Sequence, residues 1–543
     1  MNSLDWVIIA VYMAALLGMA LSMNRNQNDV QDYYLAGRRI RWWQSGVSTM
    51  ATQLSAISFV SAPAFVALKE GGGLKWLAYE FGVPLGLIAV MALIIPALHR
   101  GNYISIYEYL EERFDEETRI LISGLFQLAR GLATAVAVLA GGIIASSATG
   151  MSITSAILLI GVITILYDII GGIGIVIQSD VLQMGIVILG LVIVGGSAWS
   201  MVGWSEAWSA LDPGRLQILD FRSLGLSGGG QYGFWPMLIG GMFLYASYYG
   251  CDQSQVQREL TVPSVEEVRK SLLLNVLGRY PVVLLYCAVG VLVGAAVSQP
   301  GALSTIASAT GSNPAAVAET LRQSPDRLIP LFILSYLPHG VIGLIFVAIL
   351  AALMSSLDSA LNSLSAVTIR DIYQKRIRPG ADDAHYLTAS RICTGLWGVF
   401  CVAAAIGLAH SGGALRQTTL ILINTVGSLL YGPILATFVL GMATRWAKPG
   451  PVKIGVLAGI AVNLFLWRFS QVSWLWWNFT GFIVPVLVAA LLSIRGVTES
   501  GFVLPIREWS QTDGAIRWPR VYAWVVVYFF LMILIAYLIE RSG

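Results

Sequence analysis

Long apolar stretches recur along the whole chain, from Trp6 to Ile539, and most are close to the length that crosses a lipid bilayer. A helix needs about 20 apolar residues to span the hydrocarbon layer. Hydrophobic residues make up 56% of the chain and charged residues only 12%, about half the charged share of an ordinary soluble domain. The stretches are continuous, whereas the strands of a β-barrel would alternate. We therefore expect an all-α integral membrane protein whose surface contacts membrane lipid.

The apolar stretches define about fourteen candidate spans, and these set the expected topology. They cover residues 4–23, 42–68, 76–98, 118–148, 151–170, 175–202, 232–255, 271–298, 328–366, 386–410, 416–443, 452–471, 474–495 and 520–540. The first span follows Asp5 rather than a basic stretch, which favours a retained helix over a cleaved signal. Lys and Arg gather in the loops after the first, ninth, eleventh and thirteenth spans, for example at Arg38, Arg39 and Arg370. Because basic loops stay in the cytoplasm, we expect both termini outside.

Two of the spans contain polar or helix-breaking residues where an ordinary span would be apolar. The span 42–68 holds several Ser and Thr residues and Pro63, and the span 232–255 holds Gly250 beside Asp252. A pair of interrupted spans at matching positions is typical of a transporter built from inverted repeats, with its site near the bilayer midplane. Two kinked but ordinary helices would give the same pattern, so the residues alone leave both interpretations open.

Ionisable side chains within the spans are the strongest indication of function. Glu80, Arg130 and Asp358 stand well inside predicted spans, and Asp180 lies near the start of another. Each costs roughly 3 kcal/mol to place in the hydrocarbon, so each needs a partner or a function. The net charge of +3 is too small to indicate nucleic-acid binding, and the four cysteines lack metal-ligand spacing.

The segment 351–365 is unusually rich in serine for a membrane span. At 3.6 residues per turn, Ala352, Ser355, Ser356, Ser359 and Asn362 share one face, with Asp358 at its edge. Hydroxyl, carboxylate and carbonyl oxygens suit a small hard cation such as Na⁺. A helix-packing seam of small residues is the alternative. The buried carboxylate favours the ion, because packing alone gives no reason for an acid there.

Several motifs, in this order, resemble those of the sodium:solute symporter family. They are Asp32-Tyr-Tyr-Leu-Ala-Gly37, the interrupted span 42–68, Gly171-Gly172 with Ser179-Asp180, Asp252-Gln-Ser-Gln-Val-Gln-Arg258, Ser355-Ser356 with Asn362-Ser363, and Asp371-Ile-Tyr373. The resemblance covers most of the chain and extends to bacterial sodium/sialic acid and sodium/galactose symporters. It implies a leucine-transporter-like fold with two inverted five-helix repeats. The implied divisions are 1–41 (an extra helix and a cytoplasmic loop), 42–202 and 232–443 (the repeats), and 444–543 (extra helices).

The resemblance also implies sodium as the coupling ion, at one site or two. Carried over residue by residue, the shared sodium site falls on the carbonyls of Ala51, Leu54 and Ala352 and the hydroxyls of Ser355 and Ser356. A second site, found in sialic acid symporters, falls on Asp180, Ser355, Asp358 and Ser359. This chain departs from that pattern because Asp358 stands where a hydroxyl is expected. The aspartate could hold a second Na⁺, bind a proton or pair with another group.

The implied substrate pocket draws on five spans. Its residues are Gln53, Ser55, Ser58, Tyr79, Glu80, Arg130, Tyr245, Tyr248, Tyr249 and Asn424. Glu80 matches an acceptor for sugar hydroxyls, and Arg130 matches an arginine that holds a carboxylate, although the two could also form a structural ion pair. The lysine of the galactose symporters has no counterpart near Leu277.

These observations predict a sodium-coupled symporter that imports a small carboxylate or sugar acid, sialic-acid-like, by alternating access across a bacterial inner membrane. A neutral sugar or a simple monocarboxylate is the alternative solute, and a passive channel is a distant alternative. An enzyme is not expected, because the four histidines are scattered and no metalloprotease or hydrolase motif is present. We expect a monomer, without nucleic-acid partners.

Overall fold

The computed structural model describes residues 1–23, 29–54, 56–228, 230–411, 419–493 and 516–542. Every regular element in these ranges is helical. Eleven of the described helices are long and apolar enough to cross a membrane, or twelve if the bent pair α3 and α4 is counted as one span. The all-α, multi-pass membrane architecture is therefore confirmed, while the expected number of fourteen spans is not.

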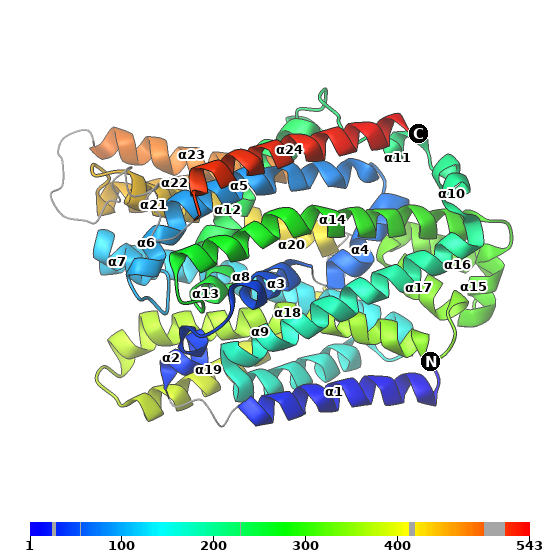
Figure 1. The fold of residues 1–543 in the computed structure, drawn as a ribbon, viewed down its shortest axis with the longest axis horizontal. Helices are drawn as coiled ribbons and strands as arrows, with labels where there is room; N and C mark the ends of the chain where they lie inside the picture. Colours follow the sequence, from blue (N-terminus) through cyan, green and yellow to red (C-terminus); the bar gives the residue numbers. More distant parts are fainter. Residues whose placement is uncertain (24–28, 55, 229, 412–418, 494–515, 543) are drawn as a thin grey trace.

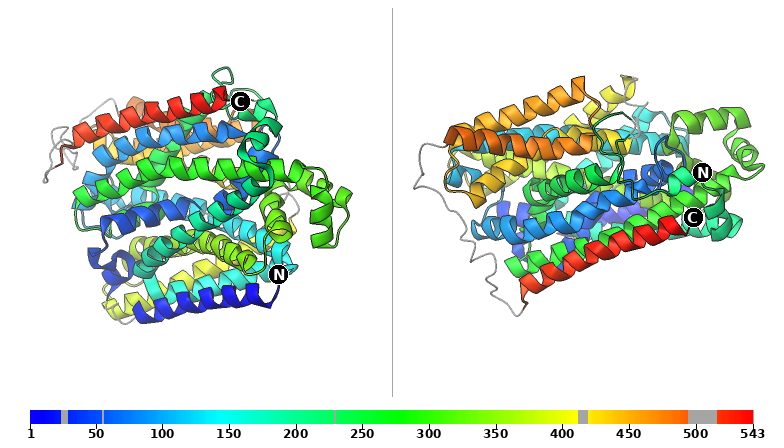
Figure 2. Two further views of the ribbon diagram at one scale, coloured as in Figure 1. Left: turned by 45° about the vertical axis from the view of Figure 1, so that its right-hand side comes forward. Right: turned by 90° about the horizontal axis from the view of Figure 1, so that it is seen from above.

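The long helices lie side by side along one axis, and both chain ends lie at the same end of the bundle (Figures 1 and 2). The longer helices are α1 (Ser3–Met23), α3 (Trp42–Gln53), α4 (Ala56–Ala67), α8 (Glu116–Thr149), α9 (Ile153–Val202), α12 (Gly241–Cys251), α14 (Val265–Ser298), α18 (Val341–Val367), α19 (Asp383–His410), α20 (Thr419–Ser428), α21 (Tyr431–Ala443), α22 (Pro449–Phe469), α23 (Trp474–Ser493) and α24 (Trp518–Arg541).

Shorter helices connect the long ones or continue them. They are α2 (Val30–Leu35), α5 (Gly82–Ala89), α6 (Ile95–Arg100), α7 (Glu108–Arg113), α10 (Trp204–Ala210), α11 (Pro213–Leu216), α13 (Gln253–Glu259), α15 (Ala302–Thr310), α16 (Pro314–Gln323) and α17 (Leu328–Tyr336), with 3₁₀ turns at Ala36–Arg38, Leu74–Phe81 and Pro325–Arg327 and π-helical segments at Val90–Ile94, Pro236–Gly240 and Thr368–Ile377. The segments α2, α6 and α7 lie at the end of the bundle opposite the termini (Figure 1).

Helix α9 contains two spans rather than one. Its 50 residues would form a straight rod of about 75 Å, more than twice the thickness of the hydrocarbon layer. The helix is interrupted at Gly172, where φ is +58° and ψ is −168°. A side chain there would strain the backbone, and its Cβ would lie 2.7 Å from the carbonyl oxygen of Tyr33. The break separates the expected spans 151–170 and 175–202.

Both interruptions expected from the sequence are present. The axes of Trp42–Gln53 and Ser58–Ala67 differ by 51°. Helix α12 ends at Cys251, and Asp252 is extended before α13 begins at Gln253. The Asp252 carboxylate accepts a hydrogen bond from the backbone N–H of Ser254, at 2.8 Å, and so caps the new helix.

The expectation of one continuous span at 328–366 is wrong. Helix α17 ends at Tyr336 and α18 begins at Val341, after an extended Leu337 and a left-handed Gly340. Leu337 precedes Pro338, and a residue before proline is driven out of the helical region. The span expected at 416–443 contains a short turn, because α20 ends at Ser428 and α21 begins at Tyr431, but Asn424–Ala443 still qualifies as one membrane span.

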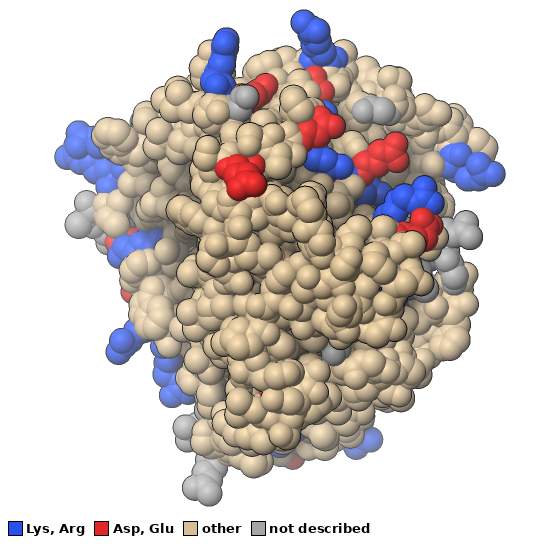
Figure 3. Space-filling view, turned by 90° about the vertical axis from the view of Figure 1, so that its right-hand side faces the viewer, with Lys and Arg blue, Asp and Glu red and all other residues tan. Residues whose placement is uncertain are grey.

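Burial separates a central helix from peripheral ones. In α18, 83% of the most apolar window is buried, against 22% in α24. Exposed large apolar side chains on the peripheral helices include Phe469, Leu491 and Trp524, which is the surface that a bilayer solvates. At the end that carries the termini, most charged side chains lie in the upper part of the view and along its left edge, and they leave a broad uncharged area in the centre and lower right (Figure 3). The serine-rich segment of α18 therefore lies in the protein interior.

Candidate functional site

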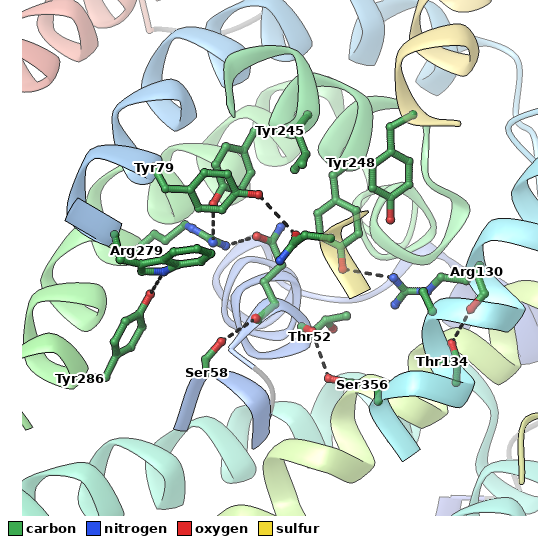
Figure 4. Close-up of a pocket in the computed structure, with 17 residues that line it drawn as sticks. Thr52, Ser58, Tyr79, Arg130, Thr134, Tyr245, Tyr248, Arg279, Tyr286 and Ser356 are labelled. Atoms are coloured by element: carbon green, nitrogen blue, oxygen red, sulfur yellow. Dashed lines mark hydrogen bonds between the residues drawn. The ribbon is translucent and has the colours of Figure 1, made fainter. Parts of the chain in front are cut away.

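A cavity lies beside the breaks in α3–α4 and α12–α13, and helices from both halves of the chain line it (Figure 4). Its lining residues are Thr52, Gln53, Ser58, Trp76, Tyr79, Arg130, Ala133, Thr134, Ala137, Leu244, Tyr245, Tyr248, Arg279, Tyr286, Ser356, Asn424 and Tyr431. Mostly polar and aromatic side chains thus meet at a site that the interrupted helices create. This arrangement suits a polar solute better than an apolar one.

Arg279, on α14, is the charged lining residue that the sequence reasoning missed. Its Nε and Nη2 atoms donate to the two carboxylate oxygens of Glu80, with 3.1 Å from Nη2 to Oε1. It also donates to Gln53 Oε1 and to the Tyr245 hydroxyl, the latter at 2.9 Å. A basic residue inside the predicted span 271–298 was the available signal. Arg279 is thus a cation in the cavity wall, two positions after Leu277, where the expected lysine was missing.

Arg130, on α8, lies on the opposite side of the cavity from Arg279 (Figure 4). Its Nη1 atom donates to the Tyr248 hydroxyl at 3.2 Å, and its guanidinium carbon is 5.7 Å from that ring's centroid. Asp252 is its partner in an ion pair, at 3.8 Å. The alternative of an ion pair between Glu80 and Arg130 is therefore wrong, because each is paired with another residue.

Aromatic and amide side chains complete the cavity wall. The Tyr79 hydroxyl donates to Asn424 Oδ1 at 3.4 Å, and the rings of Tyr79 and Tyr245 are 5.0 Å apart. The Ser58 hydroxyl donates to the backbone carbonyl of Gln53 at 3.3 Å, across the break in the helix. The contact between Tyr79 and Asn424 joins residues that lie 345 positions apart in the sequence.

Most of the expected substrate residues line the cavity. Those that do are Gln53, Ser58, Tyr79, Arg130, Tyr245, Tyr248 and Asn424. Glu80 and Tyr249 lie behind this wall: Glu80 is covered by Arg279 and Tyr245, and the Tyr249 hydroxyl donates to Asn275 Oδ1 at 3.2 Å. Ser55 falls outside the described residues.

The residues of the first sodium set meet where α3 ends against α18. The Ser356 hydroxyl donates to the carbonyl oxygens of Thr52 and Ala352, at 3.2 and 3.3 Å. Ala51 and Leu54 are buried at the same end of α3, where Leu54 leaves the helical conformation. A helix end leaves backbone carbonyls without helical partners, and such oxygens suit Na⁺. The donor set therefore fits a small hard cation.

The residues of the second sodium set are only partly brought together. Asp180 on α9 accepts hydrogen bonds from the hydroxyls of Ser355 and Ser48, and all three side chains are buried. Arg258 on α13 forms an ion pair with Asp180, 3.1 Å between Nη2 and Oδ2, and donates to the Ser359 hydroxyl. The sequence reasoning missed this arginine, although it closes the Asp252–Arg258 motif.

Asp358 differs from the other members of this set. Its Oδ1 atom accepts from the adjacent Ser359 hydroxyl at 3.2 Å. Its Oδ2 atom is buried and has no hydrogen-bond partner among the residues that the structure describes. Asp180 thus forms an ion pair with Arg258, whereas Asp358 forms no ion pair with any residue that the structure describes.

Comparison with known proteins places these features in a family. The model of the sodium:solute symporter family matches residues 33–459. The chain is 27% identical to a sodium/glucose cotransporter of Vibrio parahaemolyticus, over 87% of this chain and 86% of that one. It is 27% identical to a sodium/sialic acid symporter of Aliivibrio fischeri, over 90% and 93%. It is also 27% identical to the human sodium-coupled monocarboxylate transporter 1, over 86% and 74%.

A solved structure supports the same placement at the level of the fold. The substrate-bound, outward-open structure of a Na⁺-coupled sialic acid symporter superposes with a TM-score of 0.79 at 24% sequence identity, covering 92% of this chain and 99% of that one. Because the family model spans most of the chain, including both interrupted helices and the serine-rich segment of α18, the protein belongs to the sodium:solute symporter family.

Proposed function

We propose that this protein is a sodium-coupled secondary active symporter that imports a small organic carboxylate, with sialic-acid-like sugar acids as the leading class. Family membership supports sodium coupling, and the site supports a carboxylate. The alternative solutes are a neutral sugar and a simple monocarboxylate, and both occur among the relatives' printed names. The protein acts as a transporter rather than as an enzyme.

The main observation in favour of a carboxylate solute is that the two arginines of the cavity differ in their hydrogen-bond partners. Arg279 is bonded to Glu80, Gln53 and Tyr245 and has little capacity left. Arg130 keeps a buried Nε–H without a hydrogen-bond partner in the described ranges, and Asp252 approaches it only to 3.8 Å. A planar guanidinium with unused donors matches the paired oxygens of a carboxylate.

The remaining cavity groups suit the hydroxyl and amide groups of a sugar acid. Gln53, Tyr79 and Asn424 present amide and phenol groups to the cavity. Bulky aromatic faces from Trp76, Tyr245 and Tyr248 would pack against a ring. A short monocarboxylate would use Arg130 and leave most of these groups without a partner.

Coupling needs no covalent chemistry. A Na⁺ ion held between Ala51, Leu54, Ala352, Ser355 and Ser356 would bridge the end of α3 to α18, and Thr52, Gln53 and Ser356 line the solute cavity at the same point. Ion binding would thereby favour the conformation that binds solute, and the solute would raise the sodium affinity by the same factor. Alternating access would follow if segments 42–202 and 232–443 are the inverted repeats.

Transport by the purified protein in liposomes would test the proposal. Uptake of a sialic acid, galactose and pyruvate is measured with an inward Na⁺ gradient and with K⁺ in its place. We expect Na⁺-dependent accumulation of the sugar acid. Accumulation of galactose alone would overturn the carboxylate assignment, and solute flux that ignores the Na⁺ gradient would support a passive channel. Labelling of the termini from outside intact cells would test the proposed topology, with both ends outside the inner membrane.

A further inference from the structure

Arg258 is a fully buried cation at the centre of the expected second sodium set. Its Nη2 atom contacts Asp180 Oδ2 at 3.1 Å and the Ser359 hydroxyl, and its Nε atom donates to the Ser48 hydroxyl at 2.7 Å. A further nitrogen, Nη1, donates to the backbone carbonyl of Ser254 at 2.5 Å. Neither the arginine nor the aspartate is exposed to solvent. Each of the three guanidinium nitrogens thus donates to a protein oxygen.

Most of the oxygen atoms that a second Na⁺ would need already have partners, and Asp358 Oδ2 is the exception in the described part of the set. Asp180 Oδ1 accepts from Ser355, and Oδ2 accepts from Ser48 and Arg258. Ser359 accepts from Arg258, and its own O–H is shared between the Ser355 carbonyl and Asp358 Oδ1. A sodium ion on Asp180, Ser355 and Ser359 would therefore displace these bonds.

Charge makes such a displacement unfavourable. The ion and the guanidinium would share the same two oxygen-bearing residues, Asp180 and Ser359, and would lie only a few ångströms apart. Repulsion between like charges is strong where water is excluded, and arginine does not lose its proton to relieve it. Asp358 does not correct the imbalance in the structure, because among the described residues Arg258 forms its ion pair with Asp180 and Asp358 is bonded to Ser359.

We propose that the Arg258 guanidinium takes the place of the second cation, so that this symporter binds one Na⁺, at the set containing Ser355 and Ser356. This inference rests on the proposed function for the identity of the coupling ion. The family resemblance assigned Asp180 and Ser359 to a sodium site, whereas in the structure both residues bind the Arg258 side chain. Transport of one Na⁺ with one monovalent carboxylate would then move no net charge.

The test counts sodium ions on the purified protein without any solute. Equilibrium binding of ²²Na⁺ should saturate at one ion per chain. A count of two on the unmodified protein would overturn the proposal, whatever the variants do. The absence of any saturable ²²Na⁺ binding would instead count against the proposed function, so the two failures are distinguishable.

Variants of Arg258 test whether its charge sets the number of Na⁺ ions bound per chain. Arg258→Gln removes the competing charge and should raise the stoichiometry from one ion to two, while Arg258→Lys keeps a cation and should remain at one. Adding Asp180→Asn to Arg258→Gln should return the count to one. Each variant is first checked for a single monodisperse peak in detergent. A folded Arg258→Gln protein that still binds one ion would contradict the role given to the guanidinium.

Discussion

Arg279 and Glu80 form an ion pair in which two guanidinium nitrogens meet the two carboxylate oxygens. The Tyr245 hydroxyl joins the pair, donating to Glu80 Oε1 at 3.1 Å and accepting from Arg279 Nη2 at 2.9 Å. Arg279 comes from α14, while Glu80 comes from the 3₁₀ segment before α5. The pair therefore fixes one wall of the cavity by joining elements that are distant in the sequence.

Replacing one member of this ion pair with a neutral residue should destabilise the protein. Glu80→Gln leaves Arg279 without its charge partner, and the loss of one member of a buried pair costs about 3–5 kcal/mol. Glu80→Leu combined with Arg279→Met should regain most of that loss, because no uncompensated charge stays buried. Thermal unfolding in detergent measures both effects. Additive losses from the two single changes would show that the residues are not coupled.

Arg130 should decide between carboxylates and neutral solutes. Arg130→Gln removes the charged donors from the cavity, and hydrogen bonds to charged groups contribute about 1.5–3 kcal/mol. We expect the KM for the sugar acid to rise by about 10- to 100-fold, with a smaller change for a neutral analogue. Arg322→Gln is the matched control, since that arginine is exposed and paired with Glu319 on the same helix. An equal loss for acid and neutral analogue would argue for a structural role.

Ser356 should contribute to the sodium affinity. Ser356→Ala removes a hydroxyl that lies between the carbonyls of Thr52 and Ala352, and losing about 1.4 kcal/mol would weaken binding tenfold. Ser363→Ala is the control from the same buried helix, because among the described residues that hydroxyl bonds only to the Ala360 carbonyl within its own turn. Sodium titration of the thermal midpoint compares them. Equal shifts in both variants would remove Ser356 from the ion site.

The two buried aspartates of the α9–α18 contact should respond oppositely to amidation. Asp180→Asn leaves Arg258 without its counter-charge and should lower stability by about 3–5 kcal/mol. Asp358→Asn should cost little or stabilise, because Oδ2 has no hydrogen-bond partner in the described chain and a buried unpaired charge is unfavourable. Thermal unfolding at one sodium concentration compares the variants. A large loss at Asp358 would reveal a stabilising partner for its carboxylate.

Local sequence was enough to predict the class of fold and the places where helices break. Continuous apolar runs require helices in a bilayer because backbone groups there must bond within their own segment. Gly171-Gly172 and the Gly250–Asp252 stretch marked real interruptions, as did the polar residues of 42–68. The prediction missed the break between α17 and α18, although Pro338 and Gly340 are a local signal for it.

Some of the residues of the candidate cavity could also be predicted from the local sequence. Arg130 and the serine-rich face of α18 could be found because charged and hydroxyl groups are costly in an apolar span. Helical periodicity gives the face on which a side chain lies, but it does not say which other helix will cover that face. Helical periodicity therefore could not predict that Glu80 pairs with Arg279 rather than with Arg130.

The sequence by itself thus determined the helices, most of their breaks and the residue types available for a site. The tertiary structure decided which charges neutralise one another. Arg279 reaches Glu80 across 199 residues, and Arg258 reaches Asp180 across 78. The physical reason is that buried charges are stabilised by partners within a few ångströms, and only helix packing brings those partners together.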